Sequence, residues 1–197
     1  SFIQSSMKIE SLLLITGNQG KLDEFSSLLN IGTLLFESKA LEISEIQSMQ
    51  LEEIGKFKTN SALSFTSEVE KYDAVMTDDT ALSCDALNGL PGPFVKWFLE
   101  CVGAGGLYDL IKGNNNDCTA GCLLTIGLTK TGELFQFLGE VQGKIVAPKG
   151  NTGFGWDGVF LPNGEKLTYG QMMPDKKNVI SHRALAVKKL RSWITEN

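Results

Sequence analysis

The chain has 197 residues, of which 42% are hydrophobic and 21% charged, and its formal net charge is −5. This composition is typical of a globular protein that buries enough surface to fold without disulfides. The acidic balance argues against a nucleic-acid-binding surface, which is usually basic, and no apolar run in the sequence approaches the ~18 residues of a membrane span.

The cysteines and the amino-terminal end set expectations for compartment and domain boundaries. The four cysteines have no C-x-x-C spacing, and with one histidine in the chain no zinc-binding set is complete. We therefore expect reduced, mostly buried thiols in a cytoplasmic protein. Residues 1–6 precede Met7 and are treated as a cloning remnant. Residues 7–197 are expected to form one domain, because no repeat or linker divides them.

Strands and helices alternate in the first half of the chain. Continuous apolar runs predict strands that are buried on both faces, and apolar residues three or four apart predict helices. In chain order we expect a strand, a helix, two short strands, a long helix and a second buried strand, over residues 12–16, 21–29, 34–36, 40–43, 51–72 and 74–77. This alternation is typical of an α/β fold.

Hairpins dominate the second half of the chain. A loop rich in glycine and proline covers residues 89–93, and the polar run at 114–117 predicts a turn. The other expected elements are two short helical stretches, two long strands that form a hairpin, a further strand and a final helix, over residues 95–101, 106–111, 118–129, 134–146, 159–161 and 182–195. Together the elements predict a mixed β-sheet flanked by helices.

The segment from Thr16 to Lys21 reads Thr-Gly-Asn-Gln-Gly-Lys and lies between the first strand and the first helix. Backbone N–H groups at the start of a helix, together with a lysine, can hold an anion such as phosphate. The segment is not a P-loop, because the G-x-x-x-x-G-K-[ST] pattern is absent. An ordinary turn between a strand and a helix is the alternative interpretation.

A lysine interrupts the apolar face of the long predicted helix. That face consists of Leu51, Ile54, Ala62, Phe65 and Val69. Lys58 falls in the middle of it, and a lysine among core positions must find a partner or extend its ammonium group to water. A phosphate at the edge of the helix would satisfy Lys58. A side chain that lies along the core with its ammonium group in water is the alternative.

An acidic pair, Asp78 and Asp79, followed by Thr80, is expected at the end of the second buried strand. Adjacent strand residues point to opposite faces, so the two aspartates should not share one role. A carboxylate here could bind Mg²⁺ together with substrate phosphates, or orient and deprotonate a water molecule. Glu45 could complete a carboxylate pair. An Asp-rich turn without such a role is the alternative.

The segment from Gly153 to Gly158 matches G-x-G-x-x-G, but we reject a dinucleotide site. That motif should follow a strand and open a helix, whereas this segment precedes a predicted strand. The glycines instead allow the backbone to approach a ligand, and the ring of Phe154 or Trp156 could stack on a nucleobase. Aromatic side chains in the core of a bulged hairpin are the alternative.

Ser181, His182 and Arg183 open the final predicted helix. Ser181 is expected to cap this helix, and Arg183 falls on its apolar face. The guanidinium group should therefore point inward and bind a carbonyl, carboxylate or phosphate. His182 is the only histidine, and no serine or cysteine nucleophile motif accompanies it, which argues against a hydrolytic triad.

Four segments in this order resemble the motifs of the inosine triphosphate pyrophosphatase family. They are TGNQGK at 16–21, DDTALSCDALNGLPGPFVKWF at 78–98, GFGWDGVF at 153–160 and KNVISHR at 177–183. The resemblance extends from Leu12 to Trp193, and the run from Pro93 to Phe98 is closer to the eukaryotic branch. It implies an elongated mixed β-sheet flanked by helices, with two lobes and a central substrate cleft.

The resemblance also implies a reaction, a cofactor and an assembly. Non-canonical purine nucleoside triphosphates (ITP, dITP and XTP) would be hydrolysed to the monophosphate and pyrophosphate. Mg²⁺ would be the cofactor, with Mn²⁺ as a substitute. The enzyme would be a cytoplasmic homodimer that cleanses the nucleotide pool, with no nucleic-acid or membrane partner.

By matched position, the resemblance assigns a role to each candidate residue. Those that would bind the phosphates are Thr16, Gly17, Asn18, Gln19, Gly20, Lys21, Lys58 and Lys96. Glu45 and Asp79 would hold the metal ion, and Asp79, accompanied by Thr80, would position or activate the water. Those that would contact the base are Phe154, Gly155, Trp156, Asp157, Lys177, Ser181, His182 and Arg183.

The sequence departs from the family pattern at two places. The pair before Thr80 is Asp78-Asp79, where the family often has Glu-Asp, and the shorter side chain could alter a bond or a water position beside the site. The match between Glu45 and Lys58 needs a one-residue insertion, so Lys56 competes with Lys58. The apolar face of the predicted helix favours Lys58.

Three other functions stay open at this point. The first is a related pyrophosphatase that acts on pyrimidine or modified nucleotides. The second is a nucleotide-binding domain without turnover, although both carboxylates and all the lysines of the expected site are present. The third is nucleic-acid binding, which the acidic balance disfavours.

Overall fold

The structure is a computed structural model that describes residues 8–196. The expected remnant, residues 1–6, lies outside the described residues. The strands of the described part are β1 (Ser11–Ile15), β2 (Leu35–Lys39), β3 (Ala74–Cys84), β4 (Pro91–Gly92), β5 (Asp117–Leu128), β6 (Leu134–Ile145) and β7 (Phe160–Pro162). The helices are α1 (Gln19–Leu28), α2 (Leu51–Leu63), α3 (Thr66–Val69), α4 (Val95–Ile111), α5 (Pro174–Ile180) and α6 (His182–Glu196).

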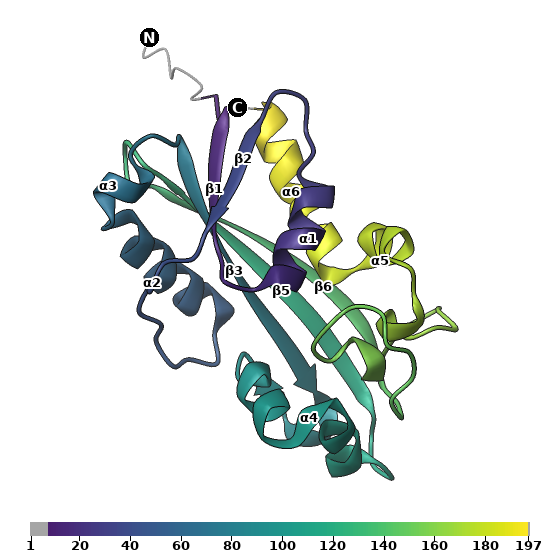
Figure 1. Cartoon of the computed structure of the whole chain (residues 1–197). Helices are drawn as coiled ribbons and strands as arrows, with labels where there is room; N and C mark the ends of the chain where they lie inside the picture. Colours follow the sequence, from purple (N-terminus) through teal and green to yellow (C-terminus); the bar gives the residue numbers. More distant parts are fainter. Residues whose placement is uncertain (1–7, 197) are drawn as a thin grey trace.

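The strands form one mixed sheet in the order β2-β1-β3-β5-β6-β7, with β4 paired to β3 (Figure 1). β1 is parallel to β2 and to β3, and the remaining pairs are antiparallel. β3, β5 and β6 are the long strands that run the length of the molecule (Figure 1). The predicted α/β fold, with a mixed sheet flanked by helices, is confirmed.

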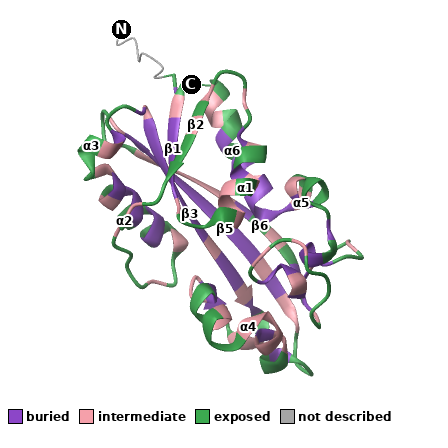
Figure 2. Ribbon diagram, in the orientation of Figure 1, coloured by how far each residue is buried: buried purple, intermediate pink, exposed green. Residues whose placement is uncertain are grey.

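Helices cover both faces of the sheet at its β1 and β3 end. Leu12 and Met76 pack with Phe25 of α1, whereas Leu13 packs with Ala62 of α2. Because successive strand residues point to opposite faces, α1 and α6 cover one face and α2 and α3 the other (Figure 1). β1, β3 and β5 are largely buried, whereas the edge strand β2 is mostly exposed (Figure 2). Among residues 8–196, no helix is both long and apolar enough to cross a membrane.

A further group of buried side chains fills the opposite end of the sheet. It includes Leu82 of β3, Leu107 of α4 and Phe160 of β7. Gly103 adopts a φ of 70° inside α4, so the helix consists of two halves. These halves correspond to the two helical stretches predicted there.

Three predicted elements differ from the structure. The helix over 51–72 is broken, because Phe65 has non-helical backbone angles (φ −81°, ψ 61°) and its side chain is 37% exposed, off the apolar face. The strand at 40–43 is absent, because the Ile43 N–H donates to the Leu41 carbonyl in a tight turn. The strand at 74–77 continues to Cys84, since pairing with β5 continues through the acidic pair. Helix α5 was not predicted.

Candidate active site

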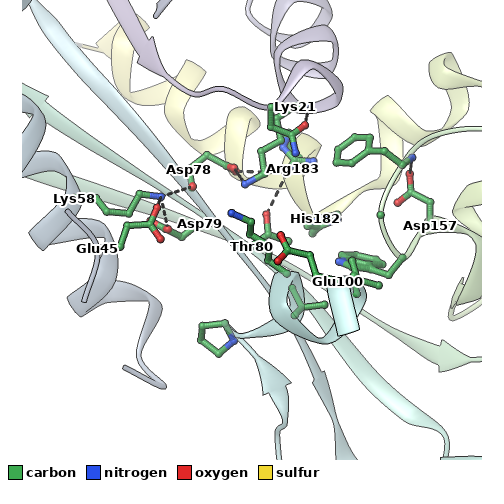
Figure 3. Close-up of a pocket in the computed structure, with 18 of the residues that line it drawn as sticks. Lys21, Glu45, Lys58, Asp78, Asp79, Thr80, Glu100, Asp157, His182 and Arg183 are labelled. Carbon is green, nitrogen blue, oxygen red and sulfur yellow. Dashed lines mark hydrogen bonds and ion pairs between the residues drawn. The ribbon is translucent and has the colours of Figure 1, made fainter. Parts of the chain in front are cut away.

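A cavity of about 400 Å³ lies where the loop after β1 faces the middle of β3 (Figure 3). The predicted site residues that line it are Asn18, Lys21, Glu45, Lys58, Asp79, Thr80, Lys96, Phe154, Gly155, Trp156, Asp157, Lys177, His182 and Arg183. Those that do not line it are Thr16, Gly17, Gln19, Gly20 and Ser181. Segments from both ends of the chain therefore meet at one cavity, as the motifs predicted.

The loop after β1 is held by two side-chain bonds. Thr16 Oγ1 accepts a hydrogen bond from the Asn18 N–H at 3.1 Å. Asn18 caps α1, since its Oδ1 accepts from the Lys21 N–H at 3.0 Å. The side chain of Lys21 then reaches the cavity, where its ammonium group pairs with Asp78. Gln19 is exposed and does not line the cavity, and its side chain donates to Asp23 at 2.7 Å.

The two aspartates of β3 point to opposite faces, as predicted. Asp78 faces the side of α1 and α6, where it meets Lys21 and Arg183. Asp79 faces α2, where its Oδ1 accepts from Lys58 Nζ at 2.7 Å. Both side chains are almost completely buried. They lie inside β3 rather than at the end of a strand, where the sequence placed them. Their burial in the strand is possible because each carboxylate is paired with a buried cation.

Of the two competing lysines of α2, Lys58 is buried and reaches Asp79, whereas Lys56 is exposed. Its Nζ lies 2.7 Å from Asp79 and 3.3 Å from Glu45 (Figure 3). Burial opposes the charged ammonium group, yet the carboxylates of Asp79 and Glu45 outweigh it and raise the pKa of Lys58. Burial raises the pKa of Asp79, and Lys58 offsets only part of that rise. Asp79 is therefore a stronger base than an exposed aspartate.

Asp78 is the opposite electrostatic case. Burial alone would raise its pKa, but the ammonium group of Lys21 and the guanidinium group of Arg183 hold the pKa of this carboxyl well below its usual range. Cys122 of β5 also donates its thiol to Asp78 Oδ2 at 3.1 Å. Asp78 is thus a permanent anion with three partners, which suits a positioning role rather than proton transfer.

The donor set around Asp79 fits a hard divalent cation. Asp79 Oδ2 is buried and has no hydrogen-bond partner among the described residues. The carboxylate of Glu45 is 60% exposed and lies 3.3 Å from Lys58 Nζ, which also contacts Asp79. In the described part of the chain, no group of three or more His, Cys, Asp or Glu side chains could enclose a metal ion. Mg²⁺ commonly binds one or two carboxylates plus substrate phosphates, which matches this open arrangement.

The glycine-rich segment presents an aromatic ring to the cavity. Asp157 Oδ2 accepts from the Phe154 N–H at 3.0 Å and from Lys177 Nζ at 2.6 Å, which closes the loop. A Cβ on Gly153 would lie 2.1 Å from Asp157 Oδ2, so only glycine fits there. The ring of Phe154 is half-buried, with Lys177 Nζ 4.8 Å from its centroid. A flat, partly exposed ring beside fixed donors suits a planar base.

Trp156 differs from Phe154, because it belongs to the core. It is 6% exposed, and its ring centroid lies 5.4 Å from that of Phe160 and 5.1 Å from that of His182. Burial, followed by the charges of Arg183 and Lys177, lowers the pKa of His182 well below its usual value. The ring of His182 is therefore neutral. The ring contacts with Phe160 and His182 confirm that Trp156 belongs to the core, although it also forms one wall of the cavity.

The start of α6 is built as predicted. Ser181 Oγ accepts from the Ala184 N–H at 3.1 Å, which confirms the cap. Arg183 is 1% exposed and points inward. Its NH1 donates to Glu24 at 2.6 Å and its NH2 to Thr80 Oγ1 at 3.2 Å. Ser181 thus acts on the helix rather than on the cavity.

Sequence reasoning missed two partners of the site residues and several lining residues, among them Leu99 and Glu100. Glu24 binds Arg183 and also accepts from Lys177, so its single charge is shared between two cations at the aromatic end of the cavity. Cys122 was counted only as a buried thiol, and Glu100 lines the cavity opposite Arg183. Glu24 follows Lys21 by three residues on α1, which is the one local signal that could have indicated it.

Known proteins resemble this chain over nearly its whole length. The Ham1 family model matches residues 12–193. The inosine triphosphate pyrophosphatase of Schizosaccharomyces pombe is 38% identical over 189 residues, which are 94% of this chain and 96% of that protein. Inosine triphosphate pyrophosphatase 1 of Trypanosoma cruzi is 41% identical over 182 residues, or 91% and 89% of the two chains.

A solved structure agrees with the fold. The HAM1 protein from Coxiella burnetii is 23% identical and superposes with a TM-score of 0.75, covering 95% of this chain and 99% of that one. The family model spans the motifs that line the cavity, from the loop after β1 to the start of α6. The chain therefore belongs to the Ham1 family.

Proposed function

We propose that the chain hydrolyses non-canonical purine nucleoside triphosphates (ITP, dITP and XTP) to the monophosphate and pyrophosphate. Two relatives carry the name inosine triphosphate pyrophosphatase, and the cavity of this chain is lined by cations, carboxylates and an aromatic ring. In this reaction water breaks the anhydride bond between the α- and β-phosphates. Asp79 takes a proton from the attacking water, which its raised pKa favours.

One observation carries the proposal more than the others. Four buried polar atoms of cavity-lining residues lack a hydrogen-bond partner within residues 8–196: Asp78 Oδ1, Asp79 Oδ2, His182 Nδ1 and Arg183 Nε. The first is compensated by its ion pair with Lys21, and the other three are not. Proteins rarely leave buried polar atoms unpaired. These atoms lie at both the acidic and the aromatic parts of the cavity. A nucleotide with a charged end and a polar base would give partners to both.

The cations divide between the two ends of the proposed ligand. Lys21 of α1, Lys58 of α2 and Lys96 of α4 line the cavity, where they would bind the triphosphate and stabilise the charge that forms on pyrophosphate. Phe154 would stack on the base. Lys177 and His182, together with Arg183, would contact its polar edge.

Mg²⁺ fits the carboxylates of Asp79 and Glu45, and Mn²⁺ would be a substitute of similar ligand preference. When bound, the ion would neutralise part of the triphosphate charge and polarise the phosphoryl oxygens. Lys58 already holds both carboxylates close together, since it contacts each of them. The protein alone therefore pre-orients the two ligands.

A panel of triphosphates with pyrophosphate detection tests the proposal. We expect ITP, dITP and XTP to release pyrophosphate far faster than ATP, GTP, CTP and UTP, and EDTA to stop the release. Preference for a pyrimidine triphosphate would support the related pyrophosphatase instead. Binding of ITP without product in a single-turnover assay would support a nucleotide-binding domain.

A matched pair of lysine variants tests the assignment on α2. Lys58→Ala leaves Asp79 buried without its cation, so we expect kcat for ITP to fall by about 10²-fold. Lys56→Ala removes an exposed lysine two residues away and should leave kcat unchanged. Steady-state kinetics of the two purified proteins give the answer. Equal losses in both would show that the helix, not the Asp79 contact, matters.

A glycine on α1 is expected to set the position of the stacking ring. A Cβ on Gly20 would lie 2.5 Å from the Phe154 ring. Gly20→Ala should therefore displace the ring and raise KM for ITP several-fold. Alanine favours a helix by about 0.5–1 kcal/mol over glycine, so the melting temperature should not fall. Gly105→Ala in α4 is the control, because its Cβ would make only an ordinary contact, 3.6 Å from Pro148. An unchanged KM in Gly20→Ala would contradict the stacking role.

We also propose a cytoplasmic homodimer, on the strength of the family resemblance. Cys84, Cys118 and Cys122 are free and buried, and Cys101 is free and exposed, which agrees with a reducing compartment. Analytical ultracentrifugation at micromolar concentration tests the dimer. A monomer across the concentration range would contradict it.

A further inference from the structure

One carboxylate lies between the two ends of the cavity. Asp78 Oδ1 forms an ion pair with Lys21, which follows the loop after β1. Asp78 Oδ2 lies 3.6 Å from Arg183 NH2 at the start of α6. The Asp78 side chain is only 2% exposed (Figure 3). A cation assigned to the phosphates and a cation assigned to the base are therefore held by the same anion.

The strand register explains why this carboxylate meets both cations. β1 and β3 are parallel, with Leu14 opposite Met76, so Asp78 lies level with the loop that follows β1. Asp78 and Thr80 are two apart and share the face toward α6. Arg183 contacts both of them, through the ion pair with Asp78 and the hydrogen bond to Thr80 Oγ1.

A thiol limits the space around the carboxylate. Cys122 of β5 is opposite Thr80 in the register and is fully buried. Its Sγ donates to Asp78 Oδ2 at 3.1 Å. Burial and the Asp78 charge raise the pKa of Cys122 well above its usual value, so the sulfur keeps its proton and stays a donor. A glutamate at position 78 would extend the carboxylate by about 1.5 Å, one C–C bond, into a space that the sulfur already occupies.

We propose that Asp78 is a positioning residue that orients Lys21 and Arg183 together, and that Cys122 fixes the reach of its carboxylate. The inference rests on the proposed function, because that function assigns the two cations to opposite ends of one nucleotide. It follows that loss of the Asp78 charge should weaken both ends at once. It also follows that a longer acid at position 78 needs a smaller residue at position 122.

A pair of substitutions that exchange size between positions 78 and 122 tests whether a longer acid needs a smaller neighbour. Asp78→Glu alone should lower kcat/KM for ITP by at least about fivefold, since the carboxylate is pushed away from its partners. Cys122→Ala alone should lower it less. The double variant Asp78→Glu/Cys122→Ala should recover most of the loss. The urea concentration at the midpoint of unfolding should show the same pattern, with the double variant recovering most of the loss seen in Asp78→Glu. Cys101→Ala, an exposed cysteine, is the control and should match the wild type.

Asp78→Asn tests whether loss of the charge weakens binding at both the phosphate end and the base end of the cavity, with one readout for each end. Inorganic tripolyphosphate, as a competitive inhibitor, reports on the phosphate end, and the ratio of kcat/KM for ITP to that for ATP reports on the base end. In Asp78→Asn we expect weaker inhibition and a lower ratio together. Lys21→Ala should change mainly the inhibition. A merely structural role would lower the yield of folded protein and leave both readouts unchanged.

The outcomes separate this inference from the proposed function. A wild-type protein that turns over no triphosphate contradicts the function. The urea midpoints of the swap series, and thermal shifts with tripolyphosphate, then still test the pairing of Asp78 with Cys122 and Lys21. Additive effects of the two swap substitutions, or a change at only one end in Asp78→Asn, overturn the inference.

Discussion

Asp79→Asn should lower kcat for ITP by about 10²–10⁴-fold, the usual contribution of a general base. The substitution removes charge and basicity but keeps the shape of the side chain. The new amide oxygen can still accept from Lys58 Nζ, which lies 2.7 Å from Asp79 Oδ1. Lys58 also keeps the Asp78 carbonyl at 3.2 Å as a partner. The fold should therefore persist, and circular dichroism with pyrophosphate release checks both points.

The control for this variant is Asp109→Asn, an exposed aspartate that pairs with Lys112 on the surface. It carries the same chemical change at a residue that does not line the cavity and should leave kcat unchanged. An Asp79→Asn protein with near-wild-type turnover in Mg²⁺ would remove Asp79 from the catalytic role. The metal proposal would then lose its central ligand as well.

Arg183→Ala should reduce the preference for ITP over ATP by ~10–100-fold, because one or two buried polar mismatches cost ~1–3 kcal/mol each. ITP carries an oxo acceptor at position six of the purine, whereas ATP carries an amino donor. Donors lining the pocket suit the first and oppose the second. Arg183 Nε has no partner among the described residues, so it is available to a base. The ratio of kcat/KM for the two substrates is the measurement.

The buried ion pairs of Arg183 complicate the alanine variant, and a second variant resolves this. Arg183→Ala leaves Glu24 with Lys177 as its cation, and such losses can cost ~3–5 kcal/mol of stability. Arg183→Lys keeps the charge but loses the planar fork, so it should lower the ratio with a smaller fall in melting temperature. Arg191→Ala, on the exposed side of the same helix, should change neither. An unchanged ratio in both Arg183 variants would refute the selectivity role.

Spacing along single elements predicted much of the cavity. The apolar face of α2 identified Lys58, and the structure places its ammonium group on Asp79. The strand alternation correctly separated Asp78 from Asp79, and the Ser181 cap and the inward direction of Arg183 are confirmed. These features depend on neighbours within a few residues, which periodicity describes well. The resemblance to the inosine triphosphate pyrophosphatases agrees with the family match.

Contacts between distant segments were not predictable in the same way. Glu24 contacts Lys177 and Arg183, which are 153 and 159 residues away in the chain. The strand β3 was expected to end at its acidic pair, because the cations that pair with it come from α1, α2 and α6. Phe65 has the spacing of a core residue but turns outward where α2 ends. Helix α5 has only seven residues, and Val179 within it is 74% exposed, so no apolar face marks it.

The most direct test of the account is the product analysis of ITP turnover by the wild-type protein with Mg²⁺. If the cavity holds the triphosphate at its lysines and carboxylates and the base at Phe154, the products are IMP and pyrophosphate in equal amounts, and ATP at the same concentration stays largely intact. Release of orthophosphate, or equal turnover of ATP and ITP, would contradict the account.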